Sequence, residues 1–151
     1  MNKNSIRTAK AQDASRIAEI EIFNYRLYFY PIFQSDAFYF DELQVLPAAE
    51  ALREDEDTLG RTLVYDDGAV KGFLRMSGSE VEKLFVEPVL HGQHIGEALL
   101  TYAIEHFGVS WLWALEKNTG AIRFYERHGF KRTDNRKPEE DTDEYLVRME
   151  R

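Results

Sequence analysis

The stretch over residues 81–130 constrains the fold of this chain more than any other, because strand and helix signals alternate in it around two closely spaced glycines. Residues 81–86 form a short run with β-branched and aromatic character, and Pro88 ends this predicted strand because proline cannot donate to a sheet ladder. Apolar residues then recur at helical spacing over residues 95–107, so a helix begins in or just after the loop that contains Gly92 and Gly96.

The first turn of such a helix leaves backbone N–H groups unpaired and carries partial positive charge, and a glycine lets a ligand approach the backbone closely. We therefore predict a site for a phosphorylated ligand in this loop. Taken alone, the segment is explained equally well by an ordinary connection in which Gly92 and Gly96 serve only the turn.

Residues 110–130 add a buried strand and a capped helix. Residues 110–115 have the composition of a buried strand, and Asn118 or Thr119 can cap the helix that follows. Gly129 fits a left-handed residue at the end of that helix. One helix face carries Ala121, Phe124, Tyr125 and His128.

Outside this stretch, the pattern predicts further strands and helices. They are, in order, a strand at 5–8, a helix at 11–26, a helix at 47–54, a hairpin over 62–76, a charged loop over 131–143 after a short strand, and a closing strand at 144–149. The helix at 11–26 is expected to bury a face made of Ala14, Ile17, Ala18, Ile20 and Phe23. Aromatic side chains are unusually dense over residues 25–40.

Length and composition favour a single domain over residues 1–151. The chain has 151 residues, of which 44% are hydrophobic and 13% aromatic, and this is sufficient for a core of ordinary size. It has neither a run of about 20 apolar residues nor a signal-peptide pattern, so we expect a cytoplasmic protein without a membrane partner. The net charge of −8 argues against nucleic acid as the main partner, and the absence of cysteine excludes disulfides and thiol nucleophiles.

Two motifs resemble those of the GNAT superfamily of N-acetyltransferases, which move acetyl groups from acetyl-CoA to amines. They are Val86-x-Pro88 followed by His91-Gly-Gln-His-Ile-Gly96 and Leu99-Leu100, and Asn118-x-x-Ala121-x-x-x-Tyr125-x-x-x-Gly129-Phe130. The resemblance covers about residues 81–131. It implies an α/β fold with a mixed, mostly antiparallel central sheet flanked by helices, in which strands four and five splay apart and the pantetheine arm lies in the gap.

The resemblance also implies roles for individual residues. The main chain of Leu84, Phe85 and Val86 should meet the acetyl-pantetheine arm, and Asn118 should hold it. The loop residues His91, Gly92, Gln93, His94, Ile95 and Gly96 should bind the pyrophosphate.

Catalysis needs a proton donor for the CoA thiolate and a proton acceptor for the amine. Tyr125, with a phenol pKa of about 10, is the expected acid, and its alternative role is that of a core tyrosine. Glu80 is the expected base, because it stands where histone-acetylating members of the superfamily carry their general base.

The alternatives to Glu80 as the base are Glu82, on the same strand face, and a water chain. Trp113 stands where some protein N-terminal acetyltransferases use a glutamate.

The loop departs from the family's pyrophosphate pattern at two positions. His91 stands where Gln or Arg is usual and His94 where glycine is usual, so only Gly96 fits. If the pattern is instead aligned to begin at Gln93, the residues match it formally. That alignment starts two residues further from the end of the strand than the alignment that begins at His91. His94 is expected to place a Cβ close to a phosphate and so to weaken CoA binding, and a partly protonated imidazole would offset part of that loss. A metal site at these histidines is not expected, because no cysteine or nearby carboxylate completes a ligand set.

The expected activity is therefore transfer of an acetyl group from acetyl-CoA by direct attack of an amine on the thioester. The acceptor is a small amine, an amino acid, a peptide N-terminus or a lysine, and residues 25–40 should shape its pocket or belong to the core. Two alternatives stay open: an acyl-CoA-binding sensor without turnover, and an interaction domain that has lost CoA. A homodimer is compatible with the family, and no metal cofactor is expected.

Overall fold

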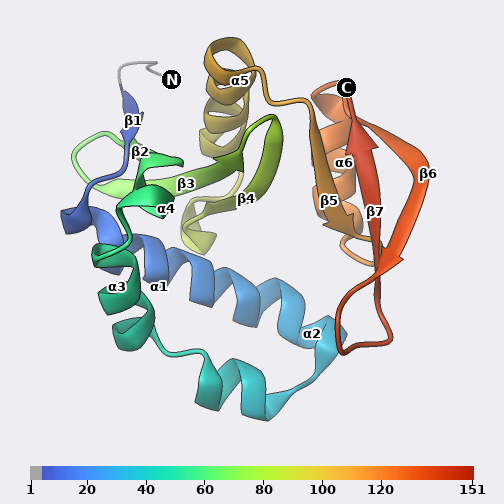
Figure 1. Ribbon diagram of the computed structural model, residues 1–151, viewed down its shortest axis with the longest axis horizontal. Coiled ribbons are helices and arrows are strands. Elements are labelled where there is room, and N and C mark those ends of the chain that lie inside the picture. Colours follow the sequence, from blue (N-terminus) through green and yellow to red (C-terminus); the bar gives the residue numbers. More distant parts are fainter. Residues whose placement is uncertain (1–4) are drawn as a thin grey trace.

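A computed structural model describes residues 5–151 and contains one seven-stranded sheet in the order β1-β2-β3-β4-β5-β7-β6 (Figure 1). The strands are β1 (Ile6–Thr8), β2 (Thr62–Asp66), β3 (Val70–Ser77), β4 (Glu80–Val86), β5 (Trp111–Leu115), β6 (Lys131–Pro138) and β7 (Tyr145–Glu150). All neighbours pair antiparallel except β4 and β5, which are parallel. The predicted α/β fold with a mixed, mostly antiparallel sheet is confirmed.

Helices cover both faces of the sheet. They are α1 (Ala14–Asn24), α2 (Tyr30–Phe33), α3 (Val45–Arg53), α4 (Glu56–Gly60), α5 (Ile95–Phe107) and α6 (Thr119–Arg127), with short 3₁₀ segments η2 (Ala11–Asp13) and η5 (Pro88–Leu90). Two π-helical segments, η3 (Tyr25–Phe29) and η4 (Ala37–Glu42), hold most of the aromatic stretch. Among the described residues, none of the helices combines the length and apolar character needed to cross a membrane.

The helix predicted at 11–26 runs further than expected. α1 passes directly into η3 and then α2, so the helical path continues to Phe33. A π turn rotates the residues that follow it relative to the α-helical pattern. At the end of α1, Phe23 is 39% exposed, so its predicted place in the buried face is wrong.

The hydrophobic core has two parts, one on each face of the sheet. Leu74, Val81 and Leu99 belong to the part under α5, together with residues of β5, β7 and α6. Phe73 and Ile17 belong to the part under α1. The strands β3 and β4 therefore carry apolar side chains on both faces, as central strands must.

The strands β4 and β5 pair only at their first residues, where Glu80 lies beside Trp111 and Val81 beside Leu112. Beyond these pairs the two strands diverge (Figure 1). The predicted splay of the fourth and fifth strands is confirmed. A register shift opposite Arg75 and Met76 occurs in β4 just after Val81, so strict alternation of side chains is broken there.

The prediction of a charged loop over residues 131–143 is wrong for its first part. Residues 131–138 form β6, the outer strand of the sheet, which pairs with β7 through an irregularity between Arg132 and Arg136. Most of its side chains are exposed, so no alternation of apolar and polar residues marks it as a strand. Charged side chains on an edge strand discourage pairing with other chains.

Asp13, at the end of η2, gives stability that depends on pH. Its carboxylate is 5% exposed and accepts hydrogen bonds from Arg7 Nη1 at 2.8 Å, Arg7 Nη2 at 3.0 Å and the Lys10 N–H at 2.8 Å. Burial raises the pKa of Asp13, but the hydrogen bonds from Arg7 and Lys10 outweigh it and hold the pKa below its usual value. A depressed carboxyl pKa adds stability above the unfolded pKa, and this is lost as the pH falls through the folded pKa.

Asp13→Asn is expected to lower the free energy of unfolding at pH 7 by about 1–3 kcal/mol, because it removes charge-assisted hydrogen bonds. The difference from the wild type should shrink as the pH falls from about 4, where the unfolded carboxyl binds a proton, through the lower folded pKa of Asp13, where the folded carboxyl does so too. Urea titrations followed by circular dichroism at several pH values measure it, with the exposed Asp41→Asn as control. An equal loss at every pH would contradict the assignment.

Candidate active site

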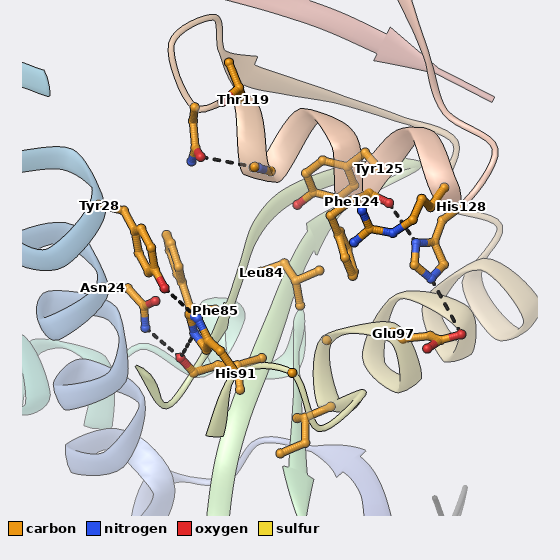
Figure 2. A pocket seen from close by; sticks show the side chains of 18 of the residues that line it. Asn24, Tyr28, Leu84, Phe85, His91, Glu97, Thr119, Phe124, Tyr125 and His128 are labelled. Atoms are coloured by element: carbon orange, nitrogen blue, oxygen red, sulfur yellow. Dashed lines mark hydrogen bonds and ion pairs between the residues drawn. The ribbon is translucent and has the colours of Figure 1, made fainter. Parts of the chain in front are cut away.

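A cavity of about 940 Å³ lies where β4 and β5 diverge, between the end of β4, the loop before α5, the start of α6 and the segment from α1 to α2 (Figure 2). This volume is in the usual range for a bound small molecule or cofactor. Ten of the residues predicted to form the site line it: Leu84, Phe85, Val86, His91, Gly92, His94, Ile95, Gly96, Asn118 and Tyr125. Gln93 and Glu80 do not line this cavity.

The free edge of β4 faces the cavity. Glu87 N–H donates to the Lys71 carbonyl on the far side, next to β3. Because main-chain groups alternate in direction along a strand, those of Leu84 and Val86 point away from β3, into the gap. β3 pairs with one edge of this part of β4, and no strand of the described residues pairs with the edge that faces the gap. An extended ligand with amide groups can therefore hydrogen-bond here as an additional strand would.

The loop before α5 presents a row of free backbone donors. The N–H groups of residues 92–97 have no acceptor within the described part of the chain, and the first bonded one is that of Ala98, which donates to the His94 carbonyl. Gly92 and His94 both have left-handed backbone, with φ of 86° and 65°. These donors lie at the N-terminus of α5 and suit an anion such as a phosphate.

His91 turns its side chain away from these donors. Its Nε2 lies 2.9 Å from the Val86 carbonyl and its Nδ1 lies 2.6 Å from the Tyr28 hydroxyl, with the two rings stacked at 5.5 Å (Figure 2). Because the carbonyl can only accept, Nε2 carries the proton, and in the neutral ring the Tyr28 hydroxyl donates to Nδ1. The side chain of His91 therefore fixes the loop against β4 and η3.

Asn24 is a site residue that the sequence did not reveal. Its side-chain amide donates to the Val86 carbonyl at 2.9 Å and to the Ile20 carbonyl at 2.8 Å, and the residue is 2% exposed. A polar residue within the apolar spacing of α1 is the signal that could have found it. Together Asn24 and His91 tie the end of β4 to α1.

The start and the middle of α6 bring two predicted residues to the cavity. Asn118 Oδ1 accepts a hydrogen bond from the Ala121 N–H at 3.3 Å, so the predicted cap is confirmed. Tyr125 packs edge-on against Phe124 and Phe130, with ring centres at 5.3 Å and 5.7 Å. Its hydroxyl makes no hydrogen bond to any described residue, and burial raises the pKa of Tyr125 well above the usual value. The phenol therefore keeps its proton at neutral pH.

The comparison with protein families agrees with this geometry. The family model "Acetyltransferase (GNAT) domain" matches residues 58–132, which include β4, the loop, α5 and α6. The chain belongs to the GNAT acetyltransferase family.

Curated relatives within the family share this region. The peptidyl-lysine N-acetyltransferase YjaB of Salmonella typhimurium is 34% identical over 70 residues, which cover 46% of this chain and 48% of the relative. An uncharacterized N-acetyltransferase of Methanocaldococcus jannaschii is 40% identical over 58 residues, covering 35% of this chain and 26% of the relative. The matched region thus spans about half of the first relative and about a quarter of the second.

Solved structures match over nearly the whole chain. The PaiA N-acetyltransferase from Thermoplasma acidophilum, in complex with coenzyme A, has a TM-score of 0.73 at 20% identity and covers 97% of this chain and 98% of its own. An N-acetyltransferase from Staphylococcus aureus Mu50 has a TM-score of 0.75 at 18% identity, with 95% and 98% covered. At this level of identity, these likenesses support the fold.

The predicted base lies apart from the cavity. Glu80 begins β4, at the point where β4 still pairs with β5. Burial and the nearby Glu82 raise the pKa of Glu80, while Lys137 and Arg148 lower it to a smaller extent. Glu82 is engaged by Arg61 at 3.0 Å. The role of Glu80 stays a prediction, because three residues of β4 separate it from Leu84 at the cavity.

His94 shows why the family prefers glycine at its position. A left-handed φ of 65° is unfavourable for a residue with a Cβ, and His94 is exposed, with Nδ1 2.9 Å from Glu97 Oε2. His94→Gly is expected to raise the free energy of unfolding by about 0.5–1 kcal/mol. The stability gained by removing the backbone strain at His94 exceeds the stability lost with the exposed contact between His94 and Glu97. Urea titration measures it. The opposite change at Gly92, with φ of 86°, is the control: Gly92→Ala should destabilise. A stability loss on His94→Gly would contradict this account.

Proposed function

We propose that this chain is an acetyl-CoA-dependent N-acetyltransferase, a single catalytic domain over residues 1–151 in which the acceptor amine attacks the thioester directly. The observation that carries the proposal is the cavity in the gap between β4 and β5, with free backbone donors of residues 92–97 at one end and the free hydroxyl of Tyr125 facing it. Membership of the GNAT family and the likeness to a coenzyme A complex support it.

The cofactor binds as an additional strand along β4. The main-chain groups of Leu84 and the N–H of Val86 hydrogen-bond the amides of the pantetheine arm, whereas the Val86 carbonyl is already taken by Asn24 and His91. The side-chain amide of Asn118 holds the arm from the α6 side. The pyrophosphate binds the N–H groups of residues 92–97. Most of these contacts use the main chain, so side-chain substitutions in the loop affect binding less than its backbone geometry does.

The reaction forms a C–N bond and breaks the C–S bond of the thioester. The neutral amine attacks the acetyl carbon, the C–S bond breaks, and Tyr125 donates its proton to the departing thiolate. The nitrogen of the new amide loses one proton, which returns to the Tyr125 phenolate through water, so the products are the neutral amide and CoA thiol. An amine with a pKa of about 10 is mostly protonated at neutral pH and must first lose a proton. Glu80 or a water chain accepts it.

Calorimetric titration with acetyl-CoA and CoA tests the cofactor site, and release of CoA on a panel of amines tests turnover. We expect about one site of micromolar affinity, followed by CoA release that depends on the added amine. Binding without CoA release on any amine would favour the sensor without turnover, for which the histidines at positions 91 and 94 are the motivation. The absence of both heat and thermal stabilisation would leave an interaction domain that has lost CoA.

The base assignment has its own test in Glu80→Gln. If Glu80 accepts the proton, the variant should lower kcat about 10²-fold and flatten the rise of kcat/KM with pH. Glu82→Gln, which changes the neighbouring carboxylate bound to Arg61, is the matched control. An unchanged pH profile in Glu80→Gln would assign the proton to water or to Glu82, and the profile of Glu82→Gln distinguishes these two.

A further inference from the structure

Arg75, on β3, is a buried cation without a carboxylate partner. The residue is 7% exposed, its Nε donates to Thr62 Oγ1 at 3.1 Å, and its guanidinium carbon lies 5.5 Å from the centre of the Phe73 ring. No acid within the described residues forms an ion pair with it. Within residues 5–151, every side-chain nitrogen that is fully buried has a hydrogen-bond partner. The Nη groups of Arg75 have none, so they are not fully buried and solvent reaches them. A guanidinium in this state is ready for an anion, since burial of an unpaired charge is costly.

A second cation lies directly opposite Arg75. The register pairs Arg75 with Lys83 of β4, so both side chains point to the α1 face of the sheet. Lys83 is bound by Glu21 of α1, which also accepts a hydrogen bond from the Tyr25 hydroxyl at 3.2 Å. Like charges directly opposite each other destabilise a sheet. With Glu21 engaged by Lys83, the pair has one cation more than it has anions.

Asp55, which lies within the electrostatic range of Arg75, has other partners. Its two carboxylate oxygens accept hydrogen bonds from the backbone N–H and the hydroxyl of Thr58 at 3.0 Å and 2.7 Å. These bonds fix Asp55 as the cap of α4. Among the described residues, no hydrogen bond or ion pair joins Asp55 directly to Arg75.

Neither cation lines the cavity, but two aromatic rings connect Lys83 to it. Lys83 directly precedes Leu84, and its ammonium lies 5.6 Å from the centre of the Tyr25 ring. That ring packs edge-on at 5.3 Å against Phe85, which lines the cavity. Burial is the main cause that raises the pKa of the Tyr25 hydroxyl, and the negative charge of Glu21 adds to the rise. The positive charge of Arg75 opposes it, so Arg75 lies within electrostatic range of this hydroxyl.

The cations and the phosphate loop lie on opposite faces of the sheet. α1 covers one face, and α5 and α6 pack on the other (Figure 1). A cofactor whose pyrophosphate binds at the start of α5 fills the gap from that side. An acceptor that reaches the thioester from the α1 side approaches on the sheet face that carries Lys83 and Arg75.

We propose that Arg75, with Lys83 beside it, binds a carboxylate of the acceptor, so that the substrate is an amine bearing an acidic group, such as an amino acid or a peptide. This inference rests on the proposed acetyltransferase function. A guanidinium presents parallel N–H groups that match the two oxygens of a carboxylate. The bound carboxylate supplies the missing negative charge of the Arg75 and Lys83 pair and orients the amine toward the gap.

The test compares acceptors that differ only in the carboxylate. CoA release is measured for lysine against cadaverine, for phenylalanine against phenethylamine, and for a dipeptide against its C-terminal amide. The wild type should prefer the carboxylate-bearing member about 10- to 100-fold in kcat/KM, as expected for a charged hydrogen-bonded contact. In Arg75→Gln the ratio should approach one, and Arg75→Lys, which keeps the charge without the fork, should fall between. The exposed Arg53→Gln should leave the ratio unchanged.

Each outcome decides the proposal. Circular dichroism verifies the fold of each variant, and if Arg75→Gln does not fold, the wild-type ratios and Arg75→Lys decide. Turnover of both members at equal rates, or an unchanged ratio in a folded Arg75 variant, overturns the carboxylate site while leaving the acetyltransferase function intact. A preference for cadaverine would assign cationic acceptors instead. Absence of turnover on every amine overturns the proposed function and this inference with it.

Discussion

Tyr125→Phe is expected to lower kcat about 10²-fold while changing the Kd for acetyl-CoA by no more than about threefold. The substitution removes the hydroxyl that faces the cavity and keeps the ring that packs on Phe124 and Phe130. Because the hydroxyl has no hydrogen-bond partner among the described residues, its removal leaves no orphaned group behind. The loss should therefore concern the chemical step rather than the fold.

Steady-state rates of CoA release and calorimetric titration measure the two quantities. Tyr102→Phe is a matched control, because Tyr102 packs on the same core from α5 and does not line the cavity. Equal kcat in Tyr125→Phe and the wild type would remove Tyr125 from the acid role. A Kd raised in proportion to the loss of kcat/KM would make Tyr125 a binding residue instead.

Phe73→Ala is expected to lower the free energy of unfolding by about 3–5 kcal/mol. Phe73 is 0% exposed, joins α1 to the sheet in the core with Ile17, and packs against the ring of Phe85 with centres at 5.9 Å. Removing it leaves a cavity between two layers that cannot close without moving α1. Urea titration followed by circular dichroism measures the loss.

A matched control for this substitution is Phe40→Ala, since Phe40 is 53% exposed. It should cost less than about 1 kcal/mol, as surface substitutions usually do. Because small proteins have only about 5–15 kcal/mol of stability, Phe73→Leu provides a milder variant if Phe73→Ala is unfolded. Similar losses for Phe73→Ala and Phe40→Ala would contradict the two-layer core.

The sequence predicted best where local chemistry determines local structure. The Asn118 cap, the left-handed Gly129 and the hairpin around Gly68 depend on neighbouring residues only, and the structure has all of them. The parallel contact of β4 with β5 was available only through the family resemblance. Periodicity alone does not encode which strands pair.

The errors and omissions have a common physical cause. β6 carries charges on an exposed edge, so pairing with β7 rather than any apolar pattern makes it a strand. Asn24 acts through the Val86 carbonyl, 62 positions further along the chain. Arg75 and Lys83 become a pair only through the register of β3 with β4. Each of these depends on contacts that a linear pattern does not contain.

The brief contact between β4 and β5 makes the sheet two ribbons joined at one end. Strands β1 to β4 form one ribbon and β5, β7 and β6 the other, and only two residue pairs of the ladder connect them. Beyond these pairs the core under α5 is what joins the two ribbons, so we expect their relative position to be less restrained without a ligand. A cofactor that bonds along β4 and is held by α6 links both ribbons. Its binding should therefore slow amide hydrogen exchange in β5 and β7 as well as in the strands it touches.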